Sequence, residues 1–201
     1  MRVLVIGDDQ VALRAAASLA AHPDVAAVGV TDFAPPPGWA GRMTKVVSSD
    51  GFDVMVGRAD PTVRSVTVDT GGTVTYADPI GLAQSLGHRL SGTVRLAITE
   101  PGRPQRSPRF FDFPPPVGRL LSRPDADGVE RCPTEGPLAA VAAGDGSRIL
   151  AVIDHPPFLA GVCLAAGVFL VSHPGPVWGQ AERYLDACAA MGLVIAESGP
   201  G

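Results

Sequence analysis

The stretch that decides the fold is Met1-Arg2-Val3-Leu4-Val5-Ile6-Gly7-Asp8-Asp9-Gln10-Val11-Ala12, at the start of the chain. Residues 3–6 are aliphatic without alternation, which predicts a strand buried on both faces of a parallel sheet. A helix-like stretch follows to Ala21, a second apolar run covers residues 25–30, and Asp32 lies just past its end. This order of strand, glycine turn, helix, strand and acid predicts a βαβ unit of the nucleotide-binding type.

The turn after the first strand departs from the dinucleotide-binding pattern. That pattern reads G-x-G-x-x-G/A, whereas this chain has Gly7, Asp9 and Ala12 at the three positions. The second glycine normally lets the backbone approach the pyrophosphate, and a carboxylate there adds bulk and negative charge beside the phosphates. Asp8 and Asp9 would instead cap the following helix. The sequence therefore indicates the fold more strongly than it indicates the cofactor.

If the turn holds a cofactor, the candidate binding residues are Gly7, Asp8, Gln10 and Asp32. Gly7 would lie against the pyrophosphate, and Asp32 would bind the hydroxyls of the adenosine ribose, which favours NAD over NADP. The nicotinamide would then lie near Gly57 and residues 69–72. The alternative is a structural loop with Asp32 as a turn aspartate and no nucleotide, so NAD, NADP and no cofactor all stay open.

The second predicted strand is not followed by a helix. Residues 33–41 are rich in proline and glycine and cannot continue a regular element. We therefore expect a loop in place of the helix of an ordinary Rossmann unit.

Composition and charge restrict the class of function. The chain has 201 residues, 46% of them hydrophobic, and a net charge of −4. This length allows one large domain or two small ones, and the lack of a basic excess argues against a nucleic-acid partner. No charged n-region precedes the first strand, and the longest uncharged apolar run, residues 156–171, is too short to span a bilayer. We therefore expect a cytoplasmic location and no membrane partner. The expected partner is a small-molecule ligand.

We expect an α/β fold, with a Rossmann-like parallel-sheet half and a smaller α+β C-terminal half. Residues 1–100 would form the Rossmann-like domain, 101–136 a connecting segment rich in proline and arginine, and 137–201 the C-terminal domain. The last part is predicted to contain a hairpin over residues 138–153 and a helix over 158–171 that is apolar on nearly all sides. Such a helix lies buried or at a subunit interface, so we expect a homodimer.

One pair of residues is a candidate for acid–base catalysis. Asp154 and His155 come at the end of a predicted strand, before a proline that starts a helix. A histidine at the C-terminal edge of a strand is well placed for proton transfer, whereas Asp154 as a simple helix cap explains the same dipeptide. The cysteines are widely spaced and no H-x-x-x-H pattern occurs, so we expect no metal site.

The two ends of the chain together resemble the saccharopine dehydrogenase-like reductases, of which this would be a shortened and divergent member. The stretches that carry the resemblance are Val3–Gly7, Asp32, Val68–Gly72, Arg148–Ile153, Phe158–Val171, His173–Val177, Ala181–Met191 and Gly192–Ile195. The resemblance implies an N-terminal Rossmann domain, a second αβ domain and NAD(P)-dependent oxidoreductase activity.

Two functions are therefore predicted. The first is a divergent NAD(P)-dependent oxidoreductase of the saccharopine reductase type, acting on a small molecule. The second is a non-redox protein that kept the Rossmann core and lost the nucleotide. It would be a ligand-binding or assembly protein, or a biosynthetic enzyme that uses Asp154 and His155. Whether the chain is an enzyme stays open at this point.

Overall fold

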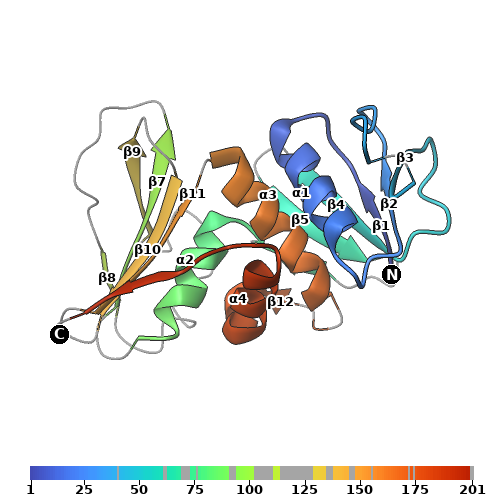
Figure 1. Ribbon diagram of the computed structural model, residues 1–201. Coiled ribbons are helices and arrows are strands. Elements are labelled where there is room, and N and C mark those ends of the chain that lie inside the picture. Colours follow the sequence, from blue (N-terminus) through green and yellow to red (C-terminus); the bar gives the residue numbers. More distant parts are fainter. Residues whose placement is uncertain are drawn as a thin grey trace.

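The computed structural model describes the chain except for residues 40, 61–62, 69–72, 76, 91–93, 102–110, 114–128, 135–137, 145–147, 155, 172, 174 and 200–201. The described residues form two β-sheets with helices packed between and beside them (Figure 1). The first sheet contains the N-terminal strands, on the right of Figure 1, and the second sheet lies on the left. This arrangement confirms a mixed α/β fold.

The first sheet contains a parallel part and an antiparallel part. Its strands are β1 (Arg2–Val5), β2 (Ala27–Val30), β3 (Met43–Lys45), β4 (Val54–Asp60), β5 (Val63–Val68), β6 (Thr73–Thr75) and β12 (Gly175–Pro176). They lie in the order β12-β6-β5-β4-β1-β2-β3. The neighbours β4, β1, β2 and β3 are parallel, whereas β5 is antiparallel to both β4 and β6.

The predicted βαβ unit is present at the centre of the parallel part. Helix α1 (Gln10–Ala21) connects β1 to β2, which pair in parallel with Val3 opposite Val28. The stripe of α1 that faces the core is made of small or aliphatic buried residues, among them Ala15, Ala16 and Leu19. The predicted loop is also confirmed, because residues 31–39 contain neither helix nor strand before β3 begins.

The second sheet is mostly antiparallel. Its strands are β7 (Val94–Pro101), β8 (Phe111–Phe113), β9 (Val129–Thr134), β10 (Leu138–Gly144), β11 (Arg148–Asp154) and β13 (Ala196–Ser198). They lie in the order β13-β11-β10-β7-β8, and β9 pairs with β7 in parallel. The predicted hairpin is confirmed, because β10 and β11 are antiparallel neighbours with Ala140 opposite Val152.

The strands of the second sheet come from all three of the expected ranges of the chain. Strand β7 begins within residues 1–100, ends at Pro101 and pairs with β10 of the second sheet. Strands β8 and β9 lie within the segment 101–136 that was expected to be a connection. Val94 and Leu96 of β7 are buried.

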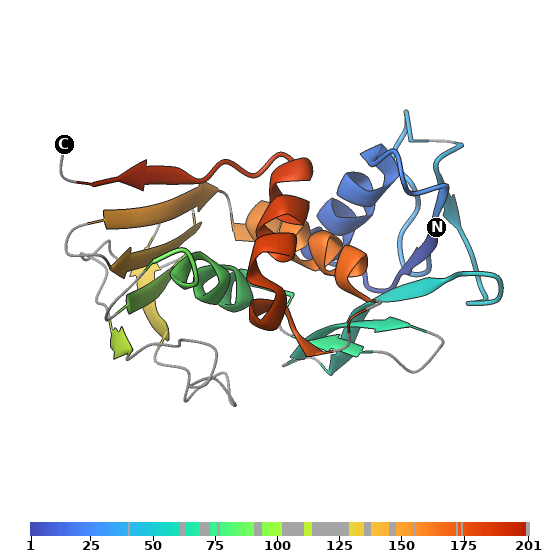
Figure 2. The ribbon, with the colours of Figure 1, turned by 90° about the horizontal axis from the view of Figure 1, so that it is seen from below.

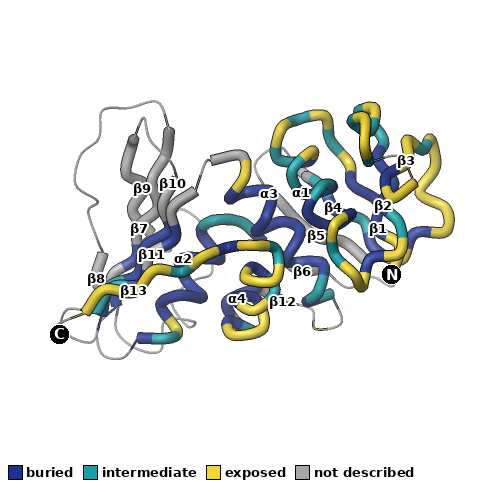
Figure 3. Tube along the Cα trace, in the orientation of Figure 1, coloured by how far each residue is buried: buried dark blue, intermediate teal, exposed yellow. Residues whose placement is uncertain are grey.

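Helix α3 (Pro156–Gly167) is the apolar helix that the sequence predicts. It contacts α1, α2 (Pro79–Gly87) and α4 (Ala181–Ala190), as well as β4 and β5. Figure 2 shows α3 between α1 and α4, and Figure 3 shows that most of its described length is buried. Elements of the same chain thus cover its apolar surface. Its composition does not require a second subunit, and the homodimer stays a prediction.

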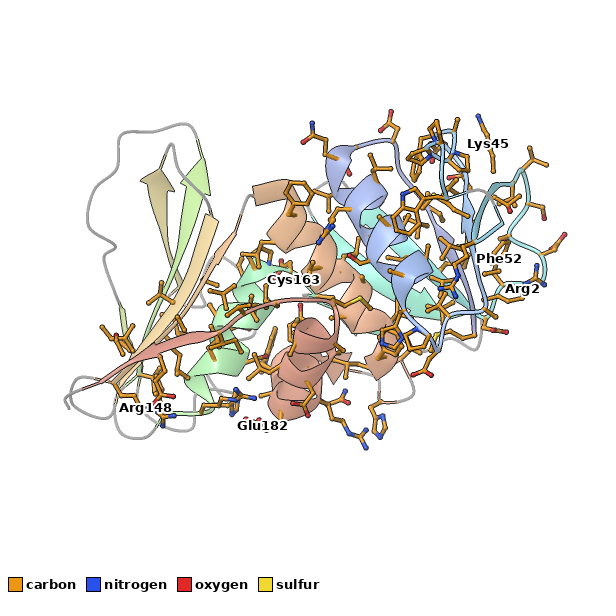
Figure 4. The ribbon with its side chains drawn as sticks, in the orientation of Figure 1. Arg2, Lys45, Phe52, Arg148, Cys163 and Glu182 are labelled. Carbon is orange, nitrogen blue, oxygen red and sulfur yellow. The ribbon has the colours of Figure 1, made fainter. Side chains whose placement is uncertain are left out.

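Helix α4 is fixed to its neighbours by polar and apolar contacts. The buried Tyr184 hydroxyl donates to the Cys163 carbonyl of α3 at 3.1 Å, and Figure 4 shows Cys163 inside the helical layer. Near the surface, the Arg89 guanidinium pairs with Glu182 at 2.9 Å, which joins the end of α2 to α4. Among the described residues, no helix has the combination of length and apolar character that crossing a bilayer requires.

The packing of α1 against α3 requires a glycine at position 161. A Cβ atom there would lie 2.6 Å from the Cβ of Arg14 and 2.9 Å from the carbonyl oxygen of Val11. The second distance involves backbone, which cannot move aside without shifting α1. The two helices therefore approach each other as closely as they do because Gly161 has no side chain.

We expect Gly161→Ala to lower the free energy of unfolding by about 1–3 kcal/mol, despite the gain in helix propensity, because the added methyl overpacks the α1–α3 contact. Urea unfolding followed by circular dichroism measures the change. Gly179→Ala is the control, since an added Cβ at this exposed position meets nothing within 4 Å. It is expected to alter stability by less than about 0.5 kcal/mol. Equal stability of the two variants would contradict the close packing of α1 against α3 at Gly161.

Candidate functional site

The turn between β1 and α1 requires glycine at position 7. Gly7 has a φ of +128°, a conformation that side chains disfavour, and an added Cβ would lie 3.2 Å from the Cβ of Ala12. On the neighbouring strand β4, an added Cβ at Gly57 would lie 3.0 Å from the Ile6 carbonyl oxygen. The backbones of β1 and β4 thus come close together where β1 ends.

Asp32 is hydrogen-bonded to this turn. Its Oδ2 atom accepts the backbone N–H of Gly7 at 3.0 Å and the Thr31 hydroxyl at 2.6 Å. The hydrogen bond from Thr31 is the largest cause that lowers the pKa of Asp32, followed by that from Gly7. The charge of Lys45, labelled at the right of Figure 4, lowers this pKa further. Asp32 is therefore a carboxylate at neutral pH. The hydrogen bonds from Gly7 and Thr31 both use its Oδ2 atom.

Asp9 is the N-cap of α1. Its Oδ1 atom accepts the backbone N–H of Ala12 at 2.8 Å, and its backbone is extended. A phosphate bound at the start of a helix would use free N–H groups of this first turn. Asp9 therefore already accepts a hydrogen bond from an N–H group that an anionic ligand would need. This agrees with the sequence interpretation in which Asp9 caps the helix.

A cavity of about 130 Å³ lies at this turn. Its lining residues are Ile6, Gly7, Asp8, Asp9, Val11, Ala12, Gly57 and Leu164. It lies where β2 and β4 flank β1 on opposite sides, the position at which parallel α/β sheets bind ligands. Leu164 of α3 contributes to its wall, so the C-terminal part of the chain takes part in the site. The volume is below the range of about 300–1,000 Å³ that is usual for ligand pockets.

The structure brings together three of the predicted cofactor residues. Gly7 and Asp8 line the cavity, and Asp32 is bonded to Gly7. Gln10 is the exposed first residue of α1 and is not among the residues that line the cavity. Residues 69–72, predicted near the nicotinamide, lie outside the described residues. The sequence did not reveal the role of Leu164, because no local pattern shows that α3 returns to the first sheet.

Asp154, one member of the predicted acid–base pair, belongs to another part of the molecule. Asp154 is the last residue of β11 in the second sheet, where its backbone pairs with Leu138. The side chain of Asp154 and the whole of His155 lie outside the described residues, so their catalytic role stays a prediction. In the described part of the chain, no group of three or more His, Cys, Asp or Glu residues is arranged to hold a metal ion.

The chain was compared with protein-family models, curated proteins and solved structures, and none of the three comparisons gave a match.

We expect Asp32→Asn to destabilise the protein at pH 7 and to have a smaller effect near pH 3. Because folding lowers the pKa of Asp32, the carboxylate contributes stability above the pKa of the unfolded chain, about 3.9. That contribution is lost as the pH falls through the folded value. Urea unfolding at both pH values measures the difference, with Asp50→Asn in an exposed turn as the control. An equal loss at both pH values would contradict this role of Asp32.

Proposed function

We propose that this chain is a non-redox, Rossmann-like ligand-binding protein whose site at the Gly7 turn takes a small hydroxylated ligand and excludes a dinucleotide. The observation that carries the proposal is the hydrogen bond from the Ala12 N–H to Asp9 Oδ1 at 2.8 Å. A pyrophosphate at this turn would have to displace Asp9 from the helix start. It would also lie beside the carboxylates of Asp8 and Asp9, which repel it.

The volume of the cavity supports the same conclusion. About 130 Å³ is too small for a dinucleotide, whereas it accommodates part of a sugar-sized molecule. A neutral ligand avoids the repulsion from the carboxylates and keeps the cap of α1 intact.

Asp32 supplies the recognition group in this proposal. In nucleotide-binding βαβ units, the acid after the second strand accepts hydrogen bonds from the ribose hydroxyls. Asp32 has this position in the chain and is ionised at neutral pH. The bonds from Gly7 and Thr31 hold its Oδ2 atom in place, and its Oδ1 atom can accept a hydroxyl of a ribosyl or similar diol ligand. A nucleoside without phosphates meets these conditions when only its ribose lies at the turn.

The second candidate is the NAD(P)-dependent oxidoreductase of the saccharopine reductase type. The position of Asp32 beside the Gly7 turn favours it, because in NAD-binding βαβ units the acid after the second strand binds the adenosine ribose. In that case Asp9 moves away when the cofactor binds, and the nicotinamide lies towards Gly57. The two candidates thus differ in whether Asp9 keeps its place as the cap of α1.

Calorimetric titration with adenosine, NADH and NADPH separates the candidates. We expect adenosine to bind with a Kd below about 1 mM and Asp32→Asn to weaken its binding about tenfold, since an amide is a poorer hydroxyl acceptor than a carboxylate. Neither dinucleotide is expected to bind measurably at about 1 mM. Micromolar binding of NADH that Gly7→Trp abolishes would refute the proposal and support the oxidoreductase.

The variant Asp9→Gly tests the reason for the exclusion. Glycine is an acceptable N-cap, so we expect the substitution to lower the free energy of unfolding by only roughly a few tenths of a kcal/mol. It restores the second glycine of the dinucleotide pattern and removes one negative charge. We expect a gain of NADH affinity of at least about tenfold relative to the unsubstituted chain. The control is Asp50→Asn, which removes a charge outside the site and is expected to leave the affinity unchanged.

A further inference from the structure

A second cavity lies beside the C-terminal half of α1, away from the Gly7 turn. Its volume is about 360 Å³, and it is bordered by α1, the end of α4 and the loop that contains Trp39. Ala17, Trp39 and Met191 give it apolar walls. This volume falls within the range of about 300–1,000 Å³ that is usual for small-ligand sites.

Ser18 lines this cavity and is 8% exposed. Its hydroxyl oxygen is buried and has no hydrogen-bond partner among the described residues. A helical serine often bonds to the carbonyl four residues earlier, as Ser85 does with the Gly81 carbonyl at 2.7 Å. A buried hydroxyl without such a bond costs free energy, which a polar atom that enters the cavity would recover after a small rotation of the side chain.

Arg14 lies one helical turn before Ser18 and lines the same cavity. Its Nε atom is buried and also lacks a hydrogen-bond partner within the described part of the chain. The centre of its guanidinium lies 4.9 Å from the centroid of the Phe158 ring, and this contact holds the group in place. A positioned guanidinium with an unused donor is suited to a carboxylate.

His22 adds a third polar group to the lining. Its Nδ1 atom accepts the backbone N–H of Asp24 at 3.2 Å and lies 4.0 Å from the Asp24 carboxylate. No aspartate or glutamate is among the described residues that line this cavity. The cavity thus combines donors and one fixed positive charge with apolar walls.

We propose that this cavity binds a small organic carboxylate whose other end is apolar or aromatic. The carboxylate accepts the N–H of Arg14 and the O–H of Ser18, while the apolar end packs against Trp39 and Met191. One guanidinium balances one carboxylate, whereas a phosphate dianion would keep an unpaired charge against apolar walls. The proposal uses no residue of the Gly7 turn and is independent of the ligand proposed there.

The test uses para-fluorobenzoate as the probe and para-fluorobenzamide as its neutral isostere, both titrated into the full chain and followed by fluorine NMR. We expect the acid to bind at least about tenfold more tightly than the amide. Arg14→Gln is expected to remove this preference, and Ser18→Ala to weaken binding of the acid about fivefold. Arg2→Gln is the matched control, because it removes a positive charge outside the cavity and leaves both affinities unchanged.

Several outcomes would overturn the proposal: no binding of the acid at about 10 mM, equal affinity for acid and amide, or displacement of the acid by an equal concentration of phosphate. If Arg14→Gln fails to fold, Ala17→Leu replaces it. Ala17 is partly exposed, and a leucine there fills the cavity from one wall. We expect this variant to lose binding of the acid, and unchanged affinity would refute the site.

Discussion

The contact between α1 and α3 is the constraint on which the rest of the structure depends. Helix α1 belongs to the βαβ unit of the first sheet, and α3 follows β11 of the second sheet, so their packing joins the two sheets. The same contact brings Leu164 to the Gly7 turn and the Phe158 ring to Arg14. Both candidate sites therefore depend on the close approach that Gly161 permits.

The two regions of α1 differ in how far the chain satisfies its own polar groups. At the N-terminal end, Asp9 and Asp32 accept backbone N–H groups, so an anionic ligand gains little there and meets repulsion. At the cavity beside the middle and C-terminal half of α1, Arg14 and Ser18 have buried donor atoms without a partner among the described residues. A ligand gains most where the protein leaves donors unsatisfied, so the second region is the better place for an anion.

The sequence predicted the βαβ unit, the loop at residues 33–41, the hairpin of β10 and β11 and the apolar helix α3, because each has a local pattern of apolar residues or turn-forming residues. It also predicted that Gly7 and Asp32 belong to one site, since the acid follows the second strand of the unit. It did not predict that β7 joins the second sheet or that Leu164 reaches the Gly7 turn. These features depend on pairing between distant segments, which no local pattern encodes.

The path of the C-terminal segment has a consequence for the order of folding during synthesis. Strand β12, at Gly175–Pro176, completes one edge of the first sheet by pairing with β6, and β13 then returns to the second sheet beside β11. A ribosome that has released only the first hundred residues has released β1 to β6 but neither α3 nor β12. The face of α1 that packs on α3 therefore lacks this partner until Pro156–Gly167 has been synthesised.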